Sequence, residues 1–404
     1  MGVHRTAWRR FAAAYAANIS GDRLADLAVP VTSVAAVGGI QLAGVYIAAH
    51  SLPRLLLGPT IAGVVQRHPH RSWCAYGNWI QAGALAFLAL MVLTGQGGVW
   101  SFAVAGTVAG AGSGVFGVSV QATIRGLVPN RRLAAANSTL EVIDSTFTLL
   151  VPLLAGVLVD LAGPAPVLGL TSLAFAAAAL MRTGIPAGEA PQGPPVTGGG
   201  PTPVRHVARV LAEPFRGPVR RFISVSLLLL GGLSVMLIPV ATFQISQLGG
   251  TATSVGVAIS AAGAGGLLTS LLAGRLTGVT RSSRWAMVMM AATAASLPLV
   301  FLSPAVGVVI VLVGVVDGLA SWLFVSLPTM RMATEKPDAL VAVSAGQMSS
   351  ASLVALAVGA GLTLFGEGTS LVVFVALAAA AAICVLAAVG SPSHLRQVQQ
   401  AVDV

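Results

Sequence analysis

Charged side chains inside long apolar segments are the residues of this sequence whose types and spacing could do chemistry. The first group is Asp22, Arg23 and Asp26, in a chain where only 8% of the residues are charged. On a helix, Asp26 lies one turn from both Asp22 and Arg23 and can contact either. A charge at the centre of a bilayer costs at least about 2.5–3.5 kcal/mol, so it normally faces a cavity or a partner. The group predicts a proton- or substrate-responsive site, with an Arg23–Asp26 pair that only fixes the helix end as the alternative.

Further charged residues fall at similar depth in later segments. With a rise of about 1.5 Å per residue and a hydrocarbon core of roughly 30 Å, we expect Arg54, Asp144 and Asp317 near the midplane. Glu141 shares a helix face with Asp144, and their repulsion and burial favour a carboxyl that binds a proton near neutral pH. The alternative is a structural pair, neutralised by Arg54 or Arg125. The predicted proton-coupling acids are Asp22, Glu141, Asp144 and Asp317.

The composition indicates what kind of elements carry these residues. The chain has 404 residues, of which 56% are hydrophobic, and a mean hydropathy of +0.89. So much apolar surface with so little charge excludes a soluble protein and indicates a polytopic, all-α membrane protein. Apolar segments of about 20 residues recur between short polar turns. We expect twelve spans, at residues 8–32, 41–65, 73–94, 99–127, 134–160, 165–183, 219–246, 253–277, 284–303, 305–329, 339–364 and 369–390.

The basic residues predict the orientation of these spans. Of the 22 Lys and Arg residues, all but Arg23 and Arg54 lie in or near the N-terminus, the turns after even-numbered spans, or the C-terminal tail. This asymmetry follows the positive-inside rule, so we expect both termini in the cytoplasm and a multi-pass location in the cytoplasmic membrane. The net charge of +10 is then explained by anchoring at the bilayer, which removes nucleic acid as a partner.

Other kinds of chemistry find little support in the sequence. Cys74 and Cys384 are far apart, so neither a disulfide framework nor a metal cluster is expected. The Gly-rich runs at residues 109–114 and 261–266 lack the Gly-Lys-Ser/Thr of a phosphate-binding loop. His50 is a lone histidine and is expected to be incidental. We therefore expect no enzyme activity, no cofactor and no metal.

The order of the spans suggests two halves. We expect an N-terminal six-helix half at 1–183, a cytoplasmic linker at 184–218, a C-terminal six-helix half at 219–390 and a cytoplasmic tail at 391–404. The linker is rich in Pro and Gly, which is typical of a flexible tether. Asp160 and Glu367 fall at the outer ends of spans and are expected to be solvated.

A weak internal repeat supports this division. Residues 44–49, Gly-Val-Tyr-Ile-Ala-Ala, align with residues 256–261, Gly-Val-Ala-Ile-Ser-Ala, at an offset of 212. Residues 133–138, Leu-Ala-Ala-Ala-Asn-Ser, likewise resemble residues 340–345, Leu-Val-Ala-Val-Ser-Ala, at an offset of 207. Two halves related by an axis along the membrane normal would produce such a pattern.

Three stretches carry a resemblance to a known family. They are Ser20-Gly21-Asp22, the loop from Gly58-Pro59 to Arg71, and the turn from Leu127 to Ser138 that enters the fifth span. Together with the twelve-span layout, they resemble the major facilitator superfamily, and most of all its drug- and siderophore-exporter branch with macrolide-efflux-type proteins. The loop departs from the family pattern, since Gln66 and Pro69 stand where the family has Asp and Gly.

The resemblance implies roles for further residues. In the resembling fold, the first, fourth, seventh and tenth spans line a central cavity. The implied substrate-binding residues are therefore Asp22, Arg54, Gln121, Gln244 and Asp317, and the implied gating residues are Arg67, Arg71 and Asn137. Arg54 could be a counter-ion to the cavity acids, an anion-binding group, or one member of an ion pair at the interface where the two halves move.

The expected function is secondary active export of a hydrophobic or amphipathic small molecule by proton antiport and alternating access. The expected partners are that substrate, protons and the lipid bilayer, and the oligomeric state stays open. The same fold also allows an importer or a lipid flippase. A rival of another class is a membrane scaffold or sensor without transport activity, acting through residues 184–218.

Overall fold

The computed structural model describes residues 2–67, 70–128, 133–183, 212–275, 283–334 and 337–389. These ranges contain twelve long helices and one short 3-10 helix. Their bounds are α1 Gly2–Val37, α2 Gln41–Arg67, α3 His70–Leu93, α4 Val99–Leu127, α5 Leu133–Ala162, α6 Pro164–Thr183, η2 Glu213–Phe215, α8 Pro218–Gln247, α9 Ala252–Arg275, α11 Ser283–Leu299, α12 Val306–Thr334, α13 Pro337–Phe365 and α14 Gly368–Val389. The predicted tail at 391–404, and the predicted linker apart from residues 212–218, lie outside the described residues.

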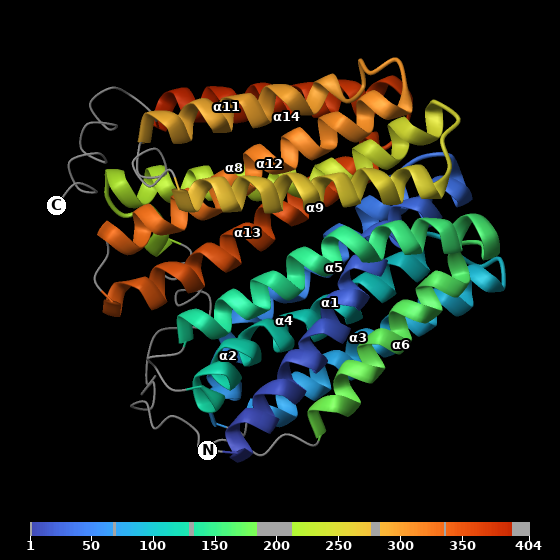
Figure 1. Cartoon of the computed structure of the whole chain (residues 1–404). Coiled ribbons are helices and arrows are strands. Elements are labelled where there is room, and N and C mark those ends of the chain that lie inside the picture. Colours follow the sequence, from blue (N-terminus) through green and yellow to red (C-terminus); the bar gives the residue numbers. More distant parts are fainter. Residues whose placement is uncertain are drawn as a thin grey trace.

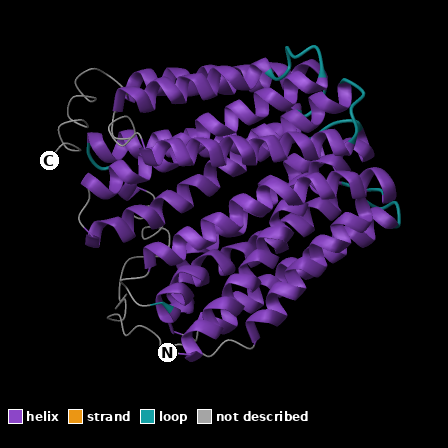
Figure 2. Ribbon diagram, in the orientation of Figure 1, coloured by secondary structure: helices purple, strands orange, loops and turns teal. Residues whose placement is uncertain are grey.

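The predicted fold class is confirmed, because every predicted span corresponds to a helix (Figure 2). Helix bounds differ from the predicted spans by a few residues, and most at α1, which already begins at Gly2. Seven of the described helices are long and apolar enough to cross a membrane by length and composition alone. Helix α1 is not among these seven, because Asp22, Arg23 and Asp26 interrupt its apolar run.

The helices form two groups, α1–α6 and α8–α14, which lie against each other (Figure 1). The start of α1 and the end of α14 lie at the same end of the molecule, as an even number of antiparallel helices requires. The short turns between α1 and α2, α5 and α6, α8 and α9, and α13 and α14 lie at the opposite end. We call this the turn end.

Contacts between the two halves are close in the half of the bundle nearer the turn end. Along α2 and α13, a Cβ added to Gly44 would lie 2.5 Å from the backbone nitrogen of Thr363. Along α5 and α9, a Cβ added to Gly256 would meet the backbone carbonyl of Pro152. Side chains at either glycine would force the backbones apart, so the two halves can approach this closely only because the residues there are small.

These two interfaces are related by the internal repeat. The offset of 212 residues that aligns the second span with the eighth maps Gly44 onto Gly256. The offset of 207 residues that aligns the fifth span with the eleventh maps Pro152 onto Gly359, and Gly359 is the residue of α13 that faces Gly44. The contact of α2 with α13 is thus the counterpart of the contact of α9 with α5.

Candidate functional site: a charged cavity between the halves

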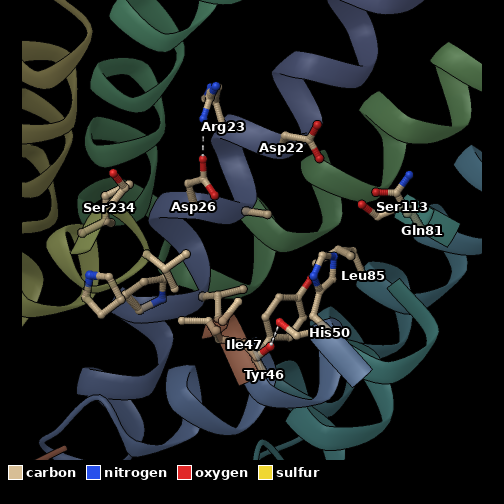
Figure 3. Close-up of a pocket in the computed structure, with 18 of the residues that line it drawn as sticks. Asp22, Arg23, Asp26, Tyr46, Ile47, His50, Gln81, Leu85, Ser113 and Ser234 are labelled. Carbon is tan, nitrogen blue, oxygen red and sulfur yellow. Dashed lines mark hydrogen bonds and ion pairs between the residues drawn. The ribbon is translucent and has the colours of Figure 1, made fainter. Parts of the chain in front are cut away.

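A cavity of about 530 Å³ lies between the two halves and collects the charged residues of α1 and α2. Eight long helices, from both halves, contribute to it. The lining residues used below are Asp22, Arg23, Asp26, Tyr46, His50, Arg54, Gln81, Phe175, Ser234, Val235, Ile238, Pro239, Asp317 and Ala355. Figure 3 shows Asp22, Arg23 and Asp26 projecting from one helix, and Tyr46 and His50 from a second.

Small and polar residues fix the position of α1 beside this cavity. Gly21 packs against the ring of Phe175 on α6, where a Cβ would lie 3.0 Å from ring carbons. One turn earlier, the buried Asn18 donates to the side-chain oxygen of Asn78 on α3 at 3.1 Å. Glycine at position 21 therefore lets α1 approach α6 closely, and the amide pair fixes its rotation, so Asp22 is directed to the cavity.

Arg23 joins two carboxylates. Its guanidinium donates to Asp26 at 2.9 Å and to Asp144 on α5 at 2.8 Å. The side chains of Arg23, Asp26 and Asp144 are 26%, 38% and 29% exposed, so all three are only partly buried. The pair of Arg23 with Asp26 that their spacing predicts is present. Arg23 also forms a second ion pair, with Asp144 on α5. Asp144 is therefore paired with Arg23 and not with Arg54, and the side chain of Arg125, the other cation considered, lies outside the described ones.

Asp22, Arg54 and Asp317 also line the cavity, but none is in an ion pair with another described residue. Asp317 comes from α12, in the C-terminal half, and lines the same cavity. Arg54 and Asp317 thus share the cavity without touching, in contrast to the pairing considered from sequence. Three charged groups remain available to a ligand or a proton.

The predicted residue Gln244 lies elsewhere. It is buried at the turn end of α8, where its amide nitrogen lies 3.4 Å from the carbonyl oxygens of Phe301 and Ser303. It is not part of the cavity lining. The side chains of Gln121, Glu141, Arg67, Arg71 and Asn137 lie outside the described ones, so their predicted roles stay predictions.

The sequence reading missed the polar face of α2. Tyr46, His50 and Arg54 are spaced four residues apart, so they stack along one face of the helix and all line the cavity. The rings of Tyr46 and His50 are stacked with centroids 5.8 Å apart. His50, which was expected to be incidental, is a cavity residue. The four-residue spacing was the signal that could have found this face.

The two walls of the cavity differ in character. The N-terminal half contributes the charged groups of α1 and α2 and the amide of Gln81 on α3. The C-terminal half contributes mostly apolar groups, namely Val235, Ile238, Pro239 and Ala355. The hydroxyl of Ser234, next to them, is buried without a hydrogen-bond partner among the described residues. An elongated molecule with one polar end and one apolar end would satisfy both walls.

Within the described ranges, no group of three or more His, Cys, Asp or Glu residues is placed to hold a metal ion. Arg23 links helix α1 to helix α5, beside a cavity that is lined by both charged and apolar groups.

Comparisons with known proteins extend this description. The family model of the Major Facilitator Superfamily matches residues 11–360. No curated protein matches the chain. Among solved structures, the chain is similar to a bacterial homologue of the iron transporter ferroportin in the inward-facing state, with a TM-score of 0.72 and 18% identity over 98% of each chain.

Two other solved structures are similar. The nucleoside transporter NupG has a TM-score of 0.68 and 13% identity, over 95% of this chain and 98% of its own. A bacterial homologue of the human lysosomal transporter Spinster, inward-facing and occupied, has a TM-score of 0.69 and 12% identity, over 100% of this chain and 97% of its own. At these identities the likeness shows a shared fold, whereas the family model covers most of the sequence. The chain therefore belongs to the Major Facilitator Superfamily and is a multi-pass membrane transporter rather than an enzyme.

Proposed function

We propose that this transporter exports a hydrophobic or amphipathic small molecule across the cytoplasmic membrane in exchange for protons. The observation that carries the proposal is the cavity itself, in which Asp22 and Asp317 form no ion pair with another described residue. They lie near the carboxylates of Asp26 and Asp144, which Arg23 links. The N-terminal half lines it with most of the charged groups, and the C-terminal half lines it with mostly apolar groups and Asp317. Such a site suits a ligand with a polar or cationic end and an apolar body.

Proton coupling follows from competition for the same carboxylates. A proton on Asp22 or Asp317 removes the charge that attracts a cationic group, so proton and substrate exclude each other. A proton on Asp144 removes one of the two anions that hold Arg23, which loosens the link between α1 and α5. Either event gives the protonated and the substrate-bound protein different preferred conformations, as coupled transport requires.

Orientation and branch are part of the proposal. The positive-inside pattern supports cytoplasmic termini, with the turn end facing outward. The stretch Ser20-Gly21-Asp22 and the turn entering α5 support the drug- and siderophore-exporter branch with macrolide-efflux-type proteins. The contact of the halves at the turn end would then leave the cavity accessible from the cytoplasm, where an exporter collects its substrate. Arg67, Arg71 and Asn137 are proposed gate residues at the cytoplasmic end.

Transport in proteoliposomes tests the proposal. The purified protein would be reconstituted and given an imposed pH gradient, with tetraphenylphosphonium as a lipophilic cation and erythromycin as a bulky macrolide. We expect gradient-driven movement of at least one probe by the wild type, and loss of the gradient dependence in Asp22→Asn and in the double variant Glu141→Gln/Asp144→Asn. Equal movement with and without the gradient would make the protein a facilitator. If deletion of residues 190–200 abolished its cellular effect while the acid variants kept it, the scaffold reading would replace transport.

A further inference from the structure

We propose that Asp160 and Glu367 are gate residues of the transport cycle, each latching the two halves together at the turn end. The inference rests on the proposed function only in that it assumes alternating access. The pair was expected to be merely solvated, and both residues are exposed. Each nevertheless bonds across the boundary between the halves.

Asp160 makes the more extensive latch. From the last turn of α5, its carboxylate accepts hydrogen bonds from the backbone N–H of Ala252 at 2.9 Å and of Thr253 at 2.8 Å. It also accepts a bond from the hydroxyl of Thr253 at 2.6 Å. Both partners lie in the first turn of α9, in the other half of the molecule. We call this contact the α5–α9 latch.

The acceptor position explains why an acid stands there. The first N–H groups of a helix have no partner within the helix, and the positive end of the helix dipole favours an anion. A capping residue of the same chain segment usually satisfies these groups. Here a carboxylate from the opposite half accepts from Ala252 and Thr253, whereas the local cap from Thr251 reaches only the N–H of Ser254, at 3.4 Å. The N–H groups of Ala252 and Thr253 therefore keep the Asp160 partner only while the halves are together.

Glu367 makes the second latch, which is smaller. Its carboxylate accepts one hydrogen bond from the side-chain amide of Gln41, at the start of α2, at 2.7 Å. Beside it, the backbone N–H of Ile40 donates to the carbonyl of Gly366 at 2.8 Å. We call this contact the α2–α13 latch. It joins the same two halves at the same end of the molecule as the first.

The internal repeat relates the two latches residue by residue. The offset of 207 residues maps Asp160 onto Glu367, and the offset of 212 residues maps Gln41 onto Thr253. Asp160 comes after Pro152, the α5 residue that contacts Gly256, and Glu367 comes after Gly359, the α13 residue that contacts Gly44. If the two contacts were unrelated, we would not expect one offset to relate the two acids and the other offset to relate their two partners. The agreement supports one device built twice, with Asp160 as its stronger copy because it accepts three bonds rather than one.

This placement assigns a role in the cycle. The latches are solvent-accessible, so water can replace their hydrogen bonds when the halves separate. Closing recovers those bonds together with the backbone contacts along α5–α9 and α2–α13. The latches therefore favour the state that is closed at the turn end, and weakening them shifts the population toward the state open there.

The test measures opening at the turn end without any substrate. A single cysteine would be introduced by Ala355→Cys, at the cavity wall, in a Cys74→Ser/Cys384→Ser background. Its reaction with a membrane-impermeant maleimide, added from the side of the turn end, reports that opening. We expect Asp160→Ala to raise the labelling rate about tenfold, the ratio expected for the loss of one hydrogen bond to a charged group, and Glu367→Gln to raise it less.

The matched control is Thr94→Ala, because Thr94 is an exposed turn-end residue whose hydroxyl bonds only to carbonyls of its own helix, at Leu90 and Met91. Its labelling rate should equal that of the parent. In a second variant, Asp160→Cys/Thr253→Cys, oxidation should form a disulfide and suppress the labelling at Ala355→Cys. Reduction of that disulfide should restore the labelling. The inference is overturned if Asp160→Ala labels like the control, or if the oxidised pair leaves labelling unchanged. Failure of proton antiport alone would leave these readouts intact.

Discussion

Arg23 on α1 holds two carboxylates at once, Asp26 at 2.9 Å and Asp144 at 2.8 Å. The first contact lies within one helix, and the second joins two helices through residues that are 121 positions apart in the chain. One cation between two anions leaves a net negative charge beside the cavity. A proton that binds either carboxylate would release a bond of Arg23 and change how α1 and α5 are held.

Removal of Arg23 should destabilise the protein more than removal of Arg54. In Arg23→Gln, Asp26 and Asp144 face each other without their shared cation. We expect a loss of about 1–2 kcal/mol, a moderate value because all three groups are partly exposed. Thermal unfolding in detergent measures it, with Arg54→Gln as the matched control, since Arg54 has no ion pair among the described residues.

A double-mutant cycle isolates the link between α1 and α5. Asp144→Asn alone should destabilise the fold, and combining it with Arg23→Gln should cost less than the sum of the two single changes, because the pair is already broken. The coupling energy would be about 0.5–3 kcal/mol. Strict additivity would show that the 2.8 Å contact contributes nothing to the stability of the fold.

Neutralising the unpaired acids should affect transport rather than folding. Asp22→Asn and Asp317→Asn each remove a cavity charge that no described residue balances by an ion pair. We expect unchanged or higher melting temperatures, together with at least about tenfold weaker binding of tetraphenylphosphonium, since tenfold corresponds to about 1.4 kcal/mol. Tritiated-ligand binding at fixed pH checks this. Unchanged affinity in both variants would remove these acids from the site.

The close glycine contacts should be intolerant of even one methyl group. Gly256→Ala places a Cβ against the carbonyl of Pro152, and Gly44→Ala places one 2.5 Å from the nitrogen of Thr363. Overpacking of this kind costs about 1–3 kcal/mol, so closure at the turn end should be impaired and transport reduced. Gly83→Ala is the control, because no atom lies within 4 Å of its added Cβ. Normal transport by Gly256→Ala would argue against a tight contact there.

Gln244 has two competing assignments, a substrate-binding role predicted from the sequence and a structural role indicated by its position. The resemblance implied a substrate contact, whereas the structure places its amide 3.4 Å from carbonyl oxygens between α11 and α12. Gln244→Ala should therefore leave substrate affinity unchanged and lower the melting temperature modestly. A large loss of affinity with normal stability would restore the substrate-binding assignment.

The helices themselves could be predicted from the sequence, because a segment of about 20 apolar residues in a bilayer has no other way to satisfy its backbone. The pairing of Arg23 with Asp26 could also be predicted, since both lie one turn apart on a single helix. Contacts within one element follow from local spacing and require no knowledge of how elements pack.

Contacts between helices were not predictable in the same way. The bond of Arg23 to Asp144 depends on how α1 and α5 are packed, which no local pattern specifies. Asp160 and Glu367 were expected to be solvated, because an acid at the end of a span gives no sign of a partner in the other half. The two repeat offsets relate the acids to each other and their partners to each other, but neither offset brings an acid to its partner.

The central claim is that substrate and protons move in opposite directions through this cavity. The most direct test measures both fluxes in the same proteoliposomes, with pyranine inside to report pH and an outward gradient of tetraphenylphosphonium to drive the exchange. The account predicts that substrate leaving the vesicles brings protons in, and that Asp22→Asn abolishes the pH change. Substrate movement by the wild type with no pH change, or with protons moving in the same direction, would contradict proton antiport.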